Sequence, residues 1–142
     1  MQEIRKAIYN KFVGDADLKA TVYGQIREGI TTRGTRLFFT EAPQNVIFPY
    51  VTFHKVSGIP EYTFTSKMEG TLYQFTCFSS ANPVTEIEDI FTKLTDVFDY
   101  AVLTFENSWT HVCCTRDFDN IEKIDNVWHC YIRYRIQITK AT

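Results

Sequence analysis

One segment near the C-terminus constrains the fold most, because apolar and polar residues alternate without a break over residues 127–139. Successive side chains of a β-strand point to opposite faces of a sheet, so the alternation predicts a strand with one buried face and one polar face. The predicted buried series is Trp128, Cys130, Ile132, Tyr134, Ile136 and Ile138, and the polar series is His129, Tyr131, Arg133, Arg135 and Gln137.

Three helices are predicted from apolar residues that recur every three or four positions. The first spans 2–13, with Ile4, Ala7, Ile8 and Phe12 on one stripe. The second follows a cap at Asp15 or Asp17, repeats Leu18, Val22 and Ile26, and closes at Gly29. The third follows Asn82 as N-cap and Pro83 at its first position, and its stripe is Val84, Ile87, Ile90, Phe91, Leu94 and Phe98.

The remaining β-prone runs predict further strands at 36–40, 49–57, 61–66, 71–80, 100–106 and 108–118. Breaks are expected in the loop 31–35, at Gly58 to Pro60, in a hairpin tip at 65–70 and in the polar turn 119–126. Strands joined by short turns favour an antiparallel sheet. We therefore predict one α+β domain over 1–142, mainly an antiparallel sheet with two N-terminal helices and one central helix packed on one face.

Composition narrows the class of protein. The net charge of −2 over 142 residues does not indicate a nucleic-acid footprint spread over the whole domain. The N-terminus has no secretory signal pattern, and no apolar run is long enough to span a bilayer. The adjacent Cys113 and Cys114 do not resemble a secreted disulfide framework. We expect a soluble, intracellular protein that makes no membrane contact.

The chain contains none of the sequence motifs of nucleophilic, metal-dependent or nucleotide-dependent catalysis, such as G-x-S-x-G, H-E-x-x-H or a glycine-rich phosphate loop. The acid pairs Glu86 with Asp89 and Asp117 with Asp119 fit a helix dipole and a turn better than acid–base chemistry. We expect no catalytic residue and no cofactor.

Two alternative sites rest on single clusters. His111, Cys113, Cys114, His129 and Cys130 include zinc-ligand types, but neighbours on a strand point to opposite faces, so the prediction is no metal. Arg133 and Arg135, with Tyr131 and His129, would suit a phosphate backbone. A polar strand face that contacts solvent or another protein fits a near-neutral domain better.

Several short motifs, taken in order, resemble the tail-completion family of tailed phages. They are the strand Arg36–Thr40, the Ala42–Pro43 turn, the Phe48–Pro49–Tyr50 entry into a strand and the Ser57–Gly58 hairpin. The strand-to-helix stretch 72–98 and a final long strand such as "CYIRYRIQI" continue the resemblance, which covers about 2–139. Residues 108–126 depart from it.

The resemblance implies a structural tail terminator that acts in the virion, at the head-proximal end of the tail, after synthesis in the host cytoplasm. Its implied partners are copies of itself in a hexameric ring, the tail tube protein and a head-completion or stopper protein. DNA would pass through the lumen without specific binding. A head-completion protein of the same neck and a small metal-binding module are the alternatives.

The proline-punctuated hairpin then becomes a shaped scaffold whose tip, within 60–70, contacts a neighbouring subunit or the tube. Pro49 fixes φ where the strand begins. The candidate interface residues are Arg36, Pro49, Tyr50, Glu61, Tyr62, Lys67, Arg133 and Arg135.

Overall fold

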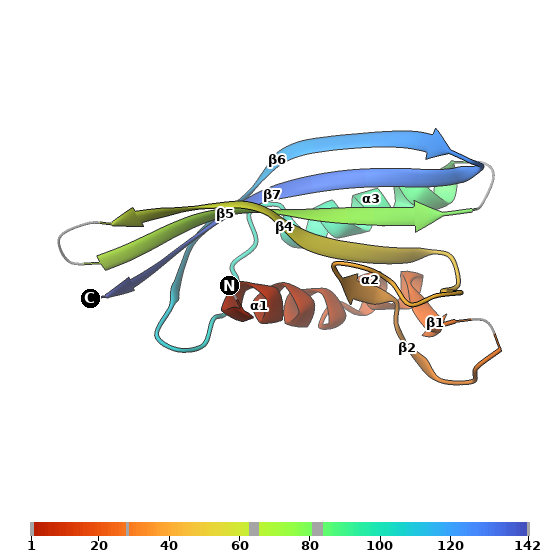
Figure 1. Cartoon of the computed structure of the whole chain (residues 1–142), viewed down its shortest axis with the longest axis horizontal. Helices are drawn as coiled ribbons and strands as arrows, with labels where there is room; N and C mark the ends of the chain where they lie inside the picture. Colours follow the sequence, from red (N-terminus) through yellow and green to blue (C-terminus); the bar gives the residue numbers. More distant parts are fainter. Residues whose placement is uncertain (1, 28, 63–65, 81–83, 142) are drawn as a thin grey trace.

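In the described part of the chain, three helices cover one face of a five-stranded sheet, and none of them lies over the other face (Figure 1). The structure, a computed structural model, describes residues 2–27, 29–62, 66–80 and 84–141; at 59–62, 66, 67 and 141 it describes the backbone alone. The helices are α1 (Gln2–Val13), α2 (Ala16–Thr21) and α3 (Thr85–Phe98). The predicted α+β class, with the helices on one face, is confirmed.

The large sheet has the strand order β3-β4-β5-β7-β6. Its strands are β3 (Leu37–Phe39), β4 (Tyr50–Tyr62), β5 (Ser66–Ser79), β6 (Thr110–Ile124) and β7 (Val127–Ala141). Every pairing is antiparallel except that of β3 with β4. A separate antiparallel pair, β1 (Tyr23–Gln25) with β2 (Arg33–Thr35), lies beside α2. The sheet is therefore mainly antiparallel, as predicted, with one parallel strand at its edge.

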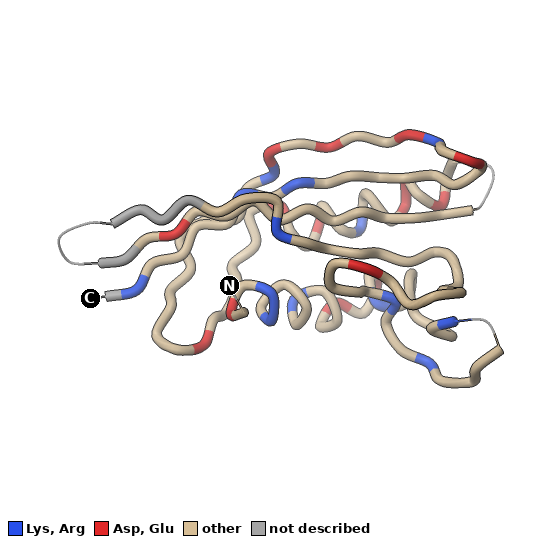
Figure 2. Tube along the Cα trace, viewed as in Figure 1, with Lys and Arg blue, Asp and Glu red and all other residues tan. Residues whose placement is uncertain are grey.

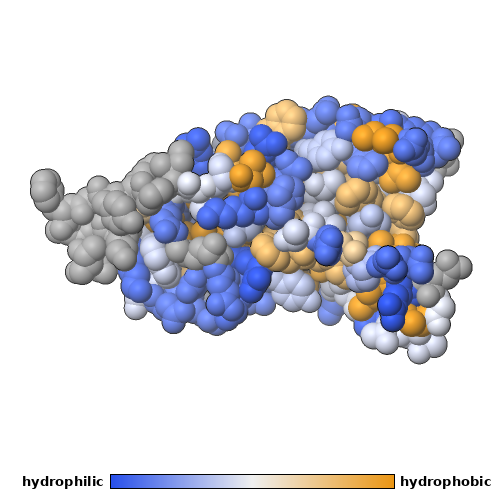
Figure 3. All heavy atoms as spheres, in the orientation of Figure 1, coloured by the Kyte–Doolittle hydropathy of each residue, from blue (hydrophilic) through white to orange (hydrophobic). Residues whose placement is uncertain are grey.

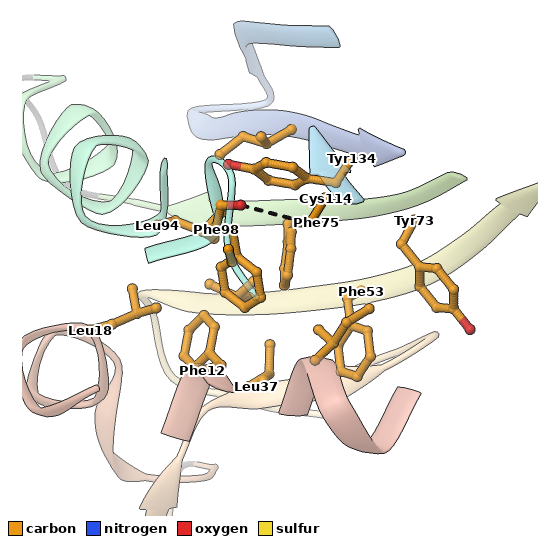
Figure 4. Close-up of a cluster of buried hydrophobic side chains, with 14 of the residues drawn as sticks. Phe12, Leu18, Leu37, Phe53, Tyr73, Phe75, Leu94, Phe98, Cys114 and Tyr134 are labelled. Atoms are coloured by element: carbon orange, nitrogen blue, oxygen red, sulfur yellow. Dashed lines mark hydrogen bonds between the residues drawn. The ribbon is translucent and has the colours of Figure 1, made fainter. Parts of the chain in front are cut away.

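The core forms where the apolar stripes of the helices meet the buried faces of the strands. Phe75 of β5 lies at its centre, with ring centroids 6.4 Å from Phe12 of α1, 4.8 Å from Phe98 of α3 and 6.1 Å from Tyr134 of β7 (Figure 4). Cys130, Ile132, Tyr134, Ile136 and Ile138 are all buried, which confirms the inward series predicted for residues 127–139. The long alternating strand thus fixes which face of the sheet the helices cover.

Helix α2 is shorter than predicted. Its cap is Asp15, whose carboxylate accepts a hydrogen bond of 2.8 Å from the backbone N–H of Leu18. The helix ends at Thr21 and not at Gly29, because the carbonyl of Val22 accepts hydrogen bonds from the backbone and the side chain of Arg36. The prediction of a loop over 31–35 is also wrong, because Arg33–Thr35 forms β2 and pairs with Tyr23–Gln25.

Strand β4 does not break at Gly58 to Pro60, contrary to the prediction. It runs on to Tyr62 with a register irregularity between Lys55 and Ser57. Beyond Phe53 no described strand pairs with the outer edge of β4, so the missing N–H of Pro60 costs no ladder hydrogen bond. Residues 66–70, predicted as a tip, are the start of β5; positions 63–65 lie outside the described residues.

The approach to β6 also differs from the prediction. Residues 100–106 form no strand, because Tyr100 has a left-handed backbone (φ 57°), although Ala101 and Leu103 are buried in the core. Residues 119–124, predicted as a turn, continue β6 along the sheet edge. Their mostly polar side chains lack the apolar alternation from which a strand is predicted. The turn itself is Asp125–Asn126, with φ of 49° and 64°, as a tight hairpin requires.

The apolar stripe predicted for α3 is confirmed, with Ile87, Ile90, Leu94 and Phe98 buried. Glu86 and Glu88 occupy its first turn, where their charge favours the helix dipole. The predicted cap Asn82 and Pro83 lie outside the described residues. In the part of the chain that the structure describes, no helix is long and apolar enough to cross a bilayer.

Candidate assembly surface

The face of the sheet without helices carries an aromatic stripe that crosses four strands. Its central pair is Tyr50 of β4 stacked on Phe78 of β5, with centroids 4.6 Å apart and planes 19° apart. His129 of β7 meets Phe78 edge-on at 4.9 Å. We define the aromatic stripe by its members: Phe38, Phe48, Tyr50, Phe78, His129 and Tyr131.

Each ring of the aromatic stripe is half-buried, and none of the described helices covers this face. Burial raises the pKa of Tyr50, so its hydroxyl keeps its proton. At the end of the stripe the hydroxyl of Tyr131 donates a hydrogen bond of 2.6 Å to Glu122 of β6, which raises the pKa of Tyr131 to about 12. The stripe is a preformed, largely uncharged surface suited to contact with another protein.

Arg133 lies on the same open face but is held within the subunit. Its Nη2 donates a hydrogen bond of 3.0 Å to Oε1 of Gln74, and its guanidinium lies 5.1 Å from the ring centre of Phe118. Its Nε is buried and is one of two buried side-chain nitrogens or oxygens without a hydrogen bond among the described residues. Arg135, two positions along, is exposed. The two arginines therefore differ in availability, which weakens a nucleic-acid site that uses both.

The sheet extends past the helices as an arm built from the end of β4, the start of β5 and the end of β7 (Figure 1). Backbone pairing joins Glu61 to Met68 and Tyr62 to Lys67 across β4 and β5, and Lys67 to Lys140 across β5 and β7. The arm therefore places three candidate interface residues, Glu61, Tyr62 and Lys67, at the far end of the long axis of the molecule.

Arg36, also a candidate interface residue, lies in the interior. It is 7% exposed, and its Nε donates a hydrogen bond of 3.2 Å to the carbonyl oxygen of Val22. Loss of solvent around the guanidinium lowers the pKa of Arg36. This side chain ties the β1–β2 pair to β3, and little of its surface remains for a partner.

The structure brings some of the candidates together and separates others. Pro49, which follows Phe48 in a cis peptide bond, directly precedes Tyr50 of the aromatic stripe. Arg133 and Arg135 share that face, the arm lies apart from it, and Arg36 is under the other face. Contact of these residues with a partner stays a prediction.

Sequence analysis did not place Phe38, Phe48 or Phe78 among the candidate interface residues. The signal was present for Phe78, because residues 72, 74, 76 and 78 share one face of a predicted strand. The sequence does not show which strands are neighbours, so it could not predict that these three aromatic residues lie on one stripe.

The histidine and cysteine cluster is divided between the two faces of the sheet, as alternation predicted. Cys114 and Cys130 are buried in the core, while Cys113 bonds to Gln137 on the open face. Burial raises the pKa of the Cys114 thiol to about 12, and a hydrogen bond with Cys130, together with burial, raises the pKa of Cys77. Among the described residues no group of three or more His, Cys, Asp or Glu side chains is placed to hold a metal ion.

One residue of each predicted acid pair makes a contact within the fold. Glu86 accepts a hydrogen bond from the hydroxyl of Ser79, which links the start of α3 to the end of β5. Asp119 lies 3.5 Å from Arg116 on β6.

With this geometry described, the chain can be compared with known proteins. No protein-family model matches the chain, and no curated protein sequence matches it. A chain in the solved structure "Virion of native gene transfer agent (GTA) particle" superposes with a TM-score of 0.80 at 14% identity. The match covers 97% of this chain and 96% of that chain. At this identity the likeness defines a shared fold.

Proposed function

We propose that the chain is a structural component of a phage-like particle, and more specifically a tail-completion protein. Six copies form a ring that caps the finished tail tube, stops its growth and offers the surface to which the head attaches. No bond is made or broken in this role. DNA passes through the lumen of the ring.

The observation that carries the proposal is the near-complete superposition on a virion chain. Because the match spans 97% of one chain and 96% of the other, it extends over nearly the full length of both chains and is not limited to a shared motif. The order of short motifs that resembles the tail-completion family supports the finer assignment. The two lines of support use different features of the chain, namely its overall fold and the order of its short sequence motifs.

The surfaces of the molecule suit such a ring. A closed ring needs head-to-tail contacts, in which two different patches of each subunit meet. Here one edge of the sheet is β6, and the opposite side of the molecule is formed by α1 and the β1–β2 pair (Figure 1). The aromatic stripe and the arm remain for contacts along the axis of the tail, with the tube protein and the head-completion protein.

The proposal is tested by adding the purified chain to polymerising tail tube protein and measuring tube length by electron microscopy. A terminator shortens the tubes and appears as a ring at one end, in proportion to its concentration. Binding to a portal-side protein without any effect on tubes would instead assign the head-completion role. Failure to bind either would contradict both.

A further inference from the structure

Edge strand β6 carries an unusual amount of exposed apolar surface. Four of its large hydrophobic side chains are exposed: Val112, Phe118, Ile121 and Ile124. Phe118 is 44% exposed and stands between two exposed acids, Asp117 and Asp119. Exposed apolar side chains gathered on one edge, with charges around them, mark a protein contact surface.

That contact is made by side chains and not by strand addition. The register of β6 on β7 shifts between His111 and Cys113 and again between Arg116 and Phe118. Bulges twist an edge strand and interrupt the row of hydrogen-bonding groups that a new strand would use. Phe118, which follows the second shift, is therefore a knob on an irregular edge.

The opposite side of the molecule offers a matching hollow between α1 and β3. It is a cavity of about 250 Å³ lined mainly by Tyr9, Leu37, Phe39 and Phe53, with Arg5 and Lys6 at its rim. Tyr9 and Phe39 are about two-fifths exposed, and Arg5 lies 4.9 Å from the ring centre of Phe39. The volume is below the roughly 300–1,000 Å³ of small-molecule sites, and it suits one inserted side chain.

The charges of the two sides are complementary. The segments 85–99 and 110–126, which contain α3 and β6, hold nine acids and three bases. Residues 2–40, which contain α1 to β3, hold seven bases and four acids. Acidic residues follow β6 and α3, while basic residues lie along α1 and beside β1 and β2 (Figure 2). Hydrophobic side chains also reach the surface along β6 and around β1 and β2 (Figure 3).

Of the charges nearest the knob and the hollow, Asp119 lies 3.5 Å from Arg116 within the subunit, and the others are more available to a partner. Among the described residues, Asp117 and Arg5 have no ion-pair partner within the subunit. Lys6 lies 3.7 Å from Glu106, but both groups are exposed, so this pair contributes little. An apolar centre with a charged rim is the arrangement that stabilises a specific interface.

From these observations we infer that the partner of β6 is a second copy of the chain. Phe118 of one subunit inserts into the α1–β3 hollow of the next, and Asp117 and Asp119 face Arg5 and Lys6 across the contact. The two patches lie on opposite sides of the subunit, so repeating the contact propagates head-to-tail, and the ring forms when the rotation between neighbours closes. This inference rests on the proposed ring and names its interface.

Charge reversal tests the contact, because it can be repaired in trans. The first variant is Asp117→Arg/Asp119→Arg, and the second is Arg5→Glu/Lys6→Glu. Each alone should remain a monomer of 16.6 kDa by native mass spectrometry, since like charges meet at every contact. An equimolar mixture should recover an alternating ring of about six times that mass, because every contact again joins opposite charges.

Matched controls separate this effect from general damage. Lys11→Glu/Asp96→Arg reverses two exposed charges beside the wide hollow between α1 and α3, and it should leave the ring intact. Phe118→Ala should abolish the ring while the monomer still unfolds cooperatively, with its melting temperature lowered only by the loss of the contact with Arg133. These comparisons show that the ring fails at the contact and not through unfolding.

Three results would overturn the inference while leaving the proposed function in place. They are rings from Asp117→Arg/Asp119→Arg alone, rings from Arg5→Glu/Lys6→Glu alone, and no recovery of the ring in the mixture. A wild-type chain that forms no ring, even with tube protein, would instead contradict the proposed function itself.

Discussion

Tyr134 of β7 donates a hydrogen bond of 2.6 Å to the carboxylate of Asp99, the residue at which α3 ends. The same carboxylate lies 3.2 Å from Arg116 of β6. One acid at the end of the central helix therefore joins both C-terminal strands. Burial, followed by the hydrogen bond to Asp99, raises the pKa of Tyr134.

Replacing Tyr134→Phe should destabilise the chain while leaving its fold unchanged. A hydrogen bond to a charged acceptor contributes about 1.5–3 kcal/mol, and Asp99 would keep Arg116 as its remaining partner. Urea denaturation measures the loss. Tyr100→Phe, at a tyrosine that is 83% exposed, is the control. Equal stability of the two variants would show that the Asp99 link is not important.

The aromatic centre of the core makes a second prediction. Phe75→Ala removes a side chain that touches rings from α1, β4, α3 and β7, and it should cost about 3–5 kcal/mol. Phe75→Leu, which keeps most of the volume, should cost less than half of that and serves if the alanine variant does not fold. Val102→Ala, at a residue that is 70% exposed, should be neutral. A neutral Phe75→Ala in the same denaturation series would contradict the packing described.

The link between Tyr131 and Glu122 predicts a dependence on alkaline pH. Unfolded tyrosines ionise near pH 10, whereas the pKa of Tyr131 in the folded chain is about 12. Because the unfolded state loses its proton first, the stability from this group is fully present below pH 10 and is lost as the pH rises through 12.

Absorbance titration of tyrosinate should follow that ionisation directly. Glu122→Gln removes the carboxylate acceptor, so the pKa of Tyr131 should fall toward its ordinary value. Glu106→Gln is the control, because no described hydrogen bond joins this exposed acid to a tyrosine hydroxyl. It should leave the curve of the wild type unchanged. Superimposable curves for Glu122→Gln and wild type would count against the hydrogen bond.

Arg133 and Arg135 should behave differently although they are two residues apart. Arg133→Ala loses the bond to Gln74 and the contact with Phe118, and it should cost about 1 kcal/mol. Arg135→Ala, at an exposed position, should change stability by no more than about 0.5 kcal/mol.

Neither arginine substitution should change the affinity for duplex DNA. A lumen through which DNA moves is expected to bind it no more tightly than a Kd of about 1 µM at physiological salt. Fluorescence anisotropy with labelled duplex measures this for wild type and both variants. Tight, salt-dependent binding that the substitutions abolish would favour a nucleic-acid binder instead.

The fold could be predicted from sequence where the residue pattern of a single element is enough to identify its buried face. The alternation of residues 127–139 and the stripe of α3 each fix a buried face without reference to the rest of the chain. The reading failed where tertiary contacts override local preference. A hydrogen bond from Arg36 to the Val22 carbonyl ends α2 earlier than its sequence predicts. Strand β6 continues through polar residues because β7 pairs with it.

The candidate surface was harder to predict, because it depends on neighbours that sequence does not reveal. Tyr50 and Phe78 become one stacked pair only when β4 and β5 take their observed register. In the same way, the α1–β3 hollow exists only once β3 lies parallel to β4. Residues 108–126, where the family resemblance fails, contain the edge strand that we assign to subunit contact.

The central claim is that the chain ends the growth of a phage-like tail and joins it to the head. Electron microscopy of particles from a producer that lacks this chain tests it most directly. The account predicts over-long tail tubes without heads, together with tailless heads, and recovery of normal particles when the chain is supplied in trans. Tails of normal length that remain joined to heads in its absence would contradict the claim.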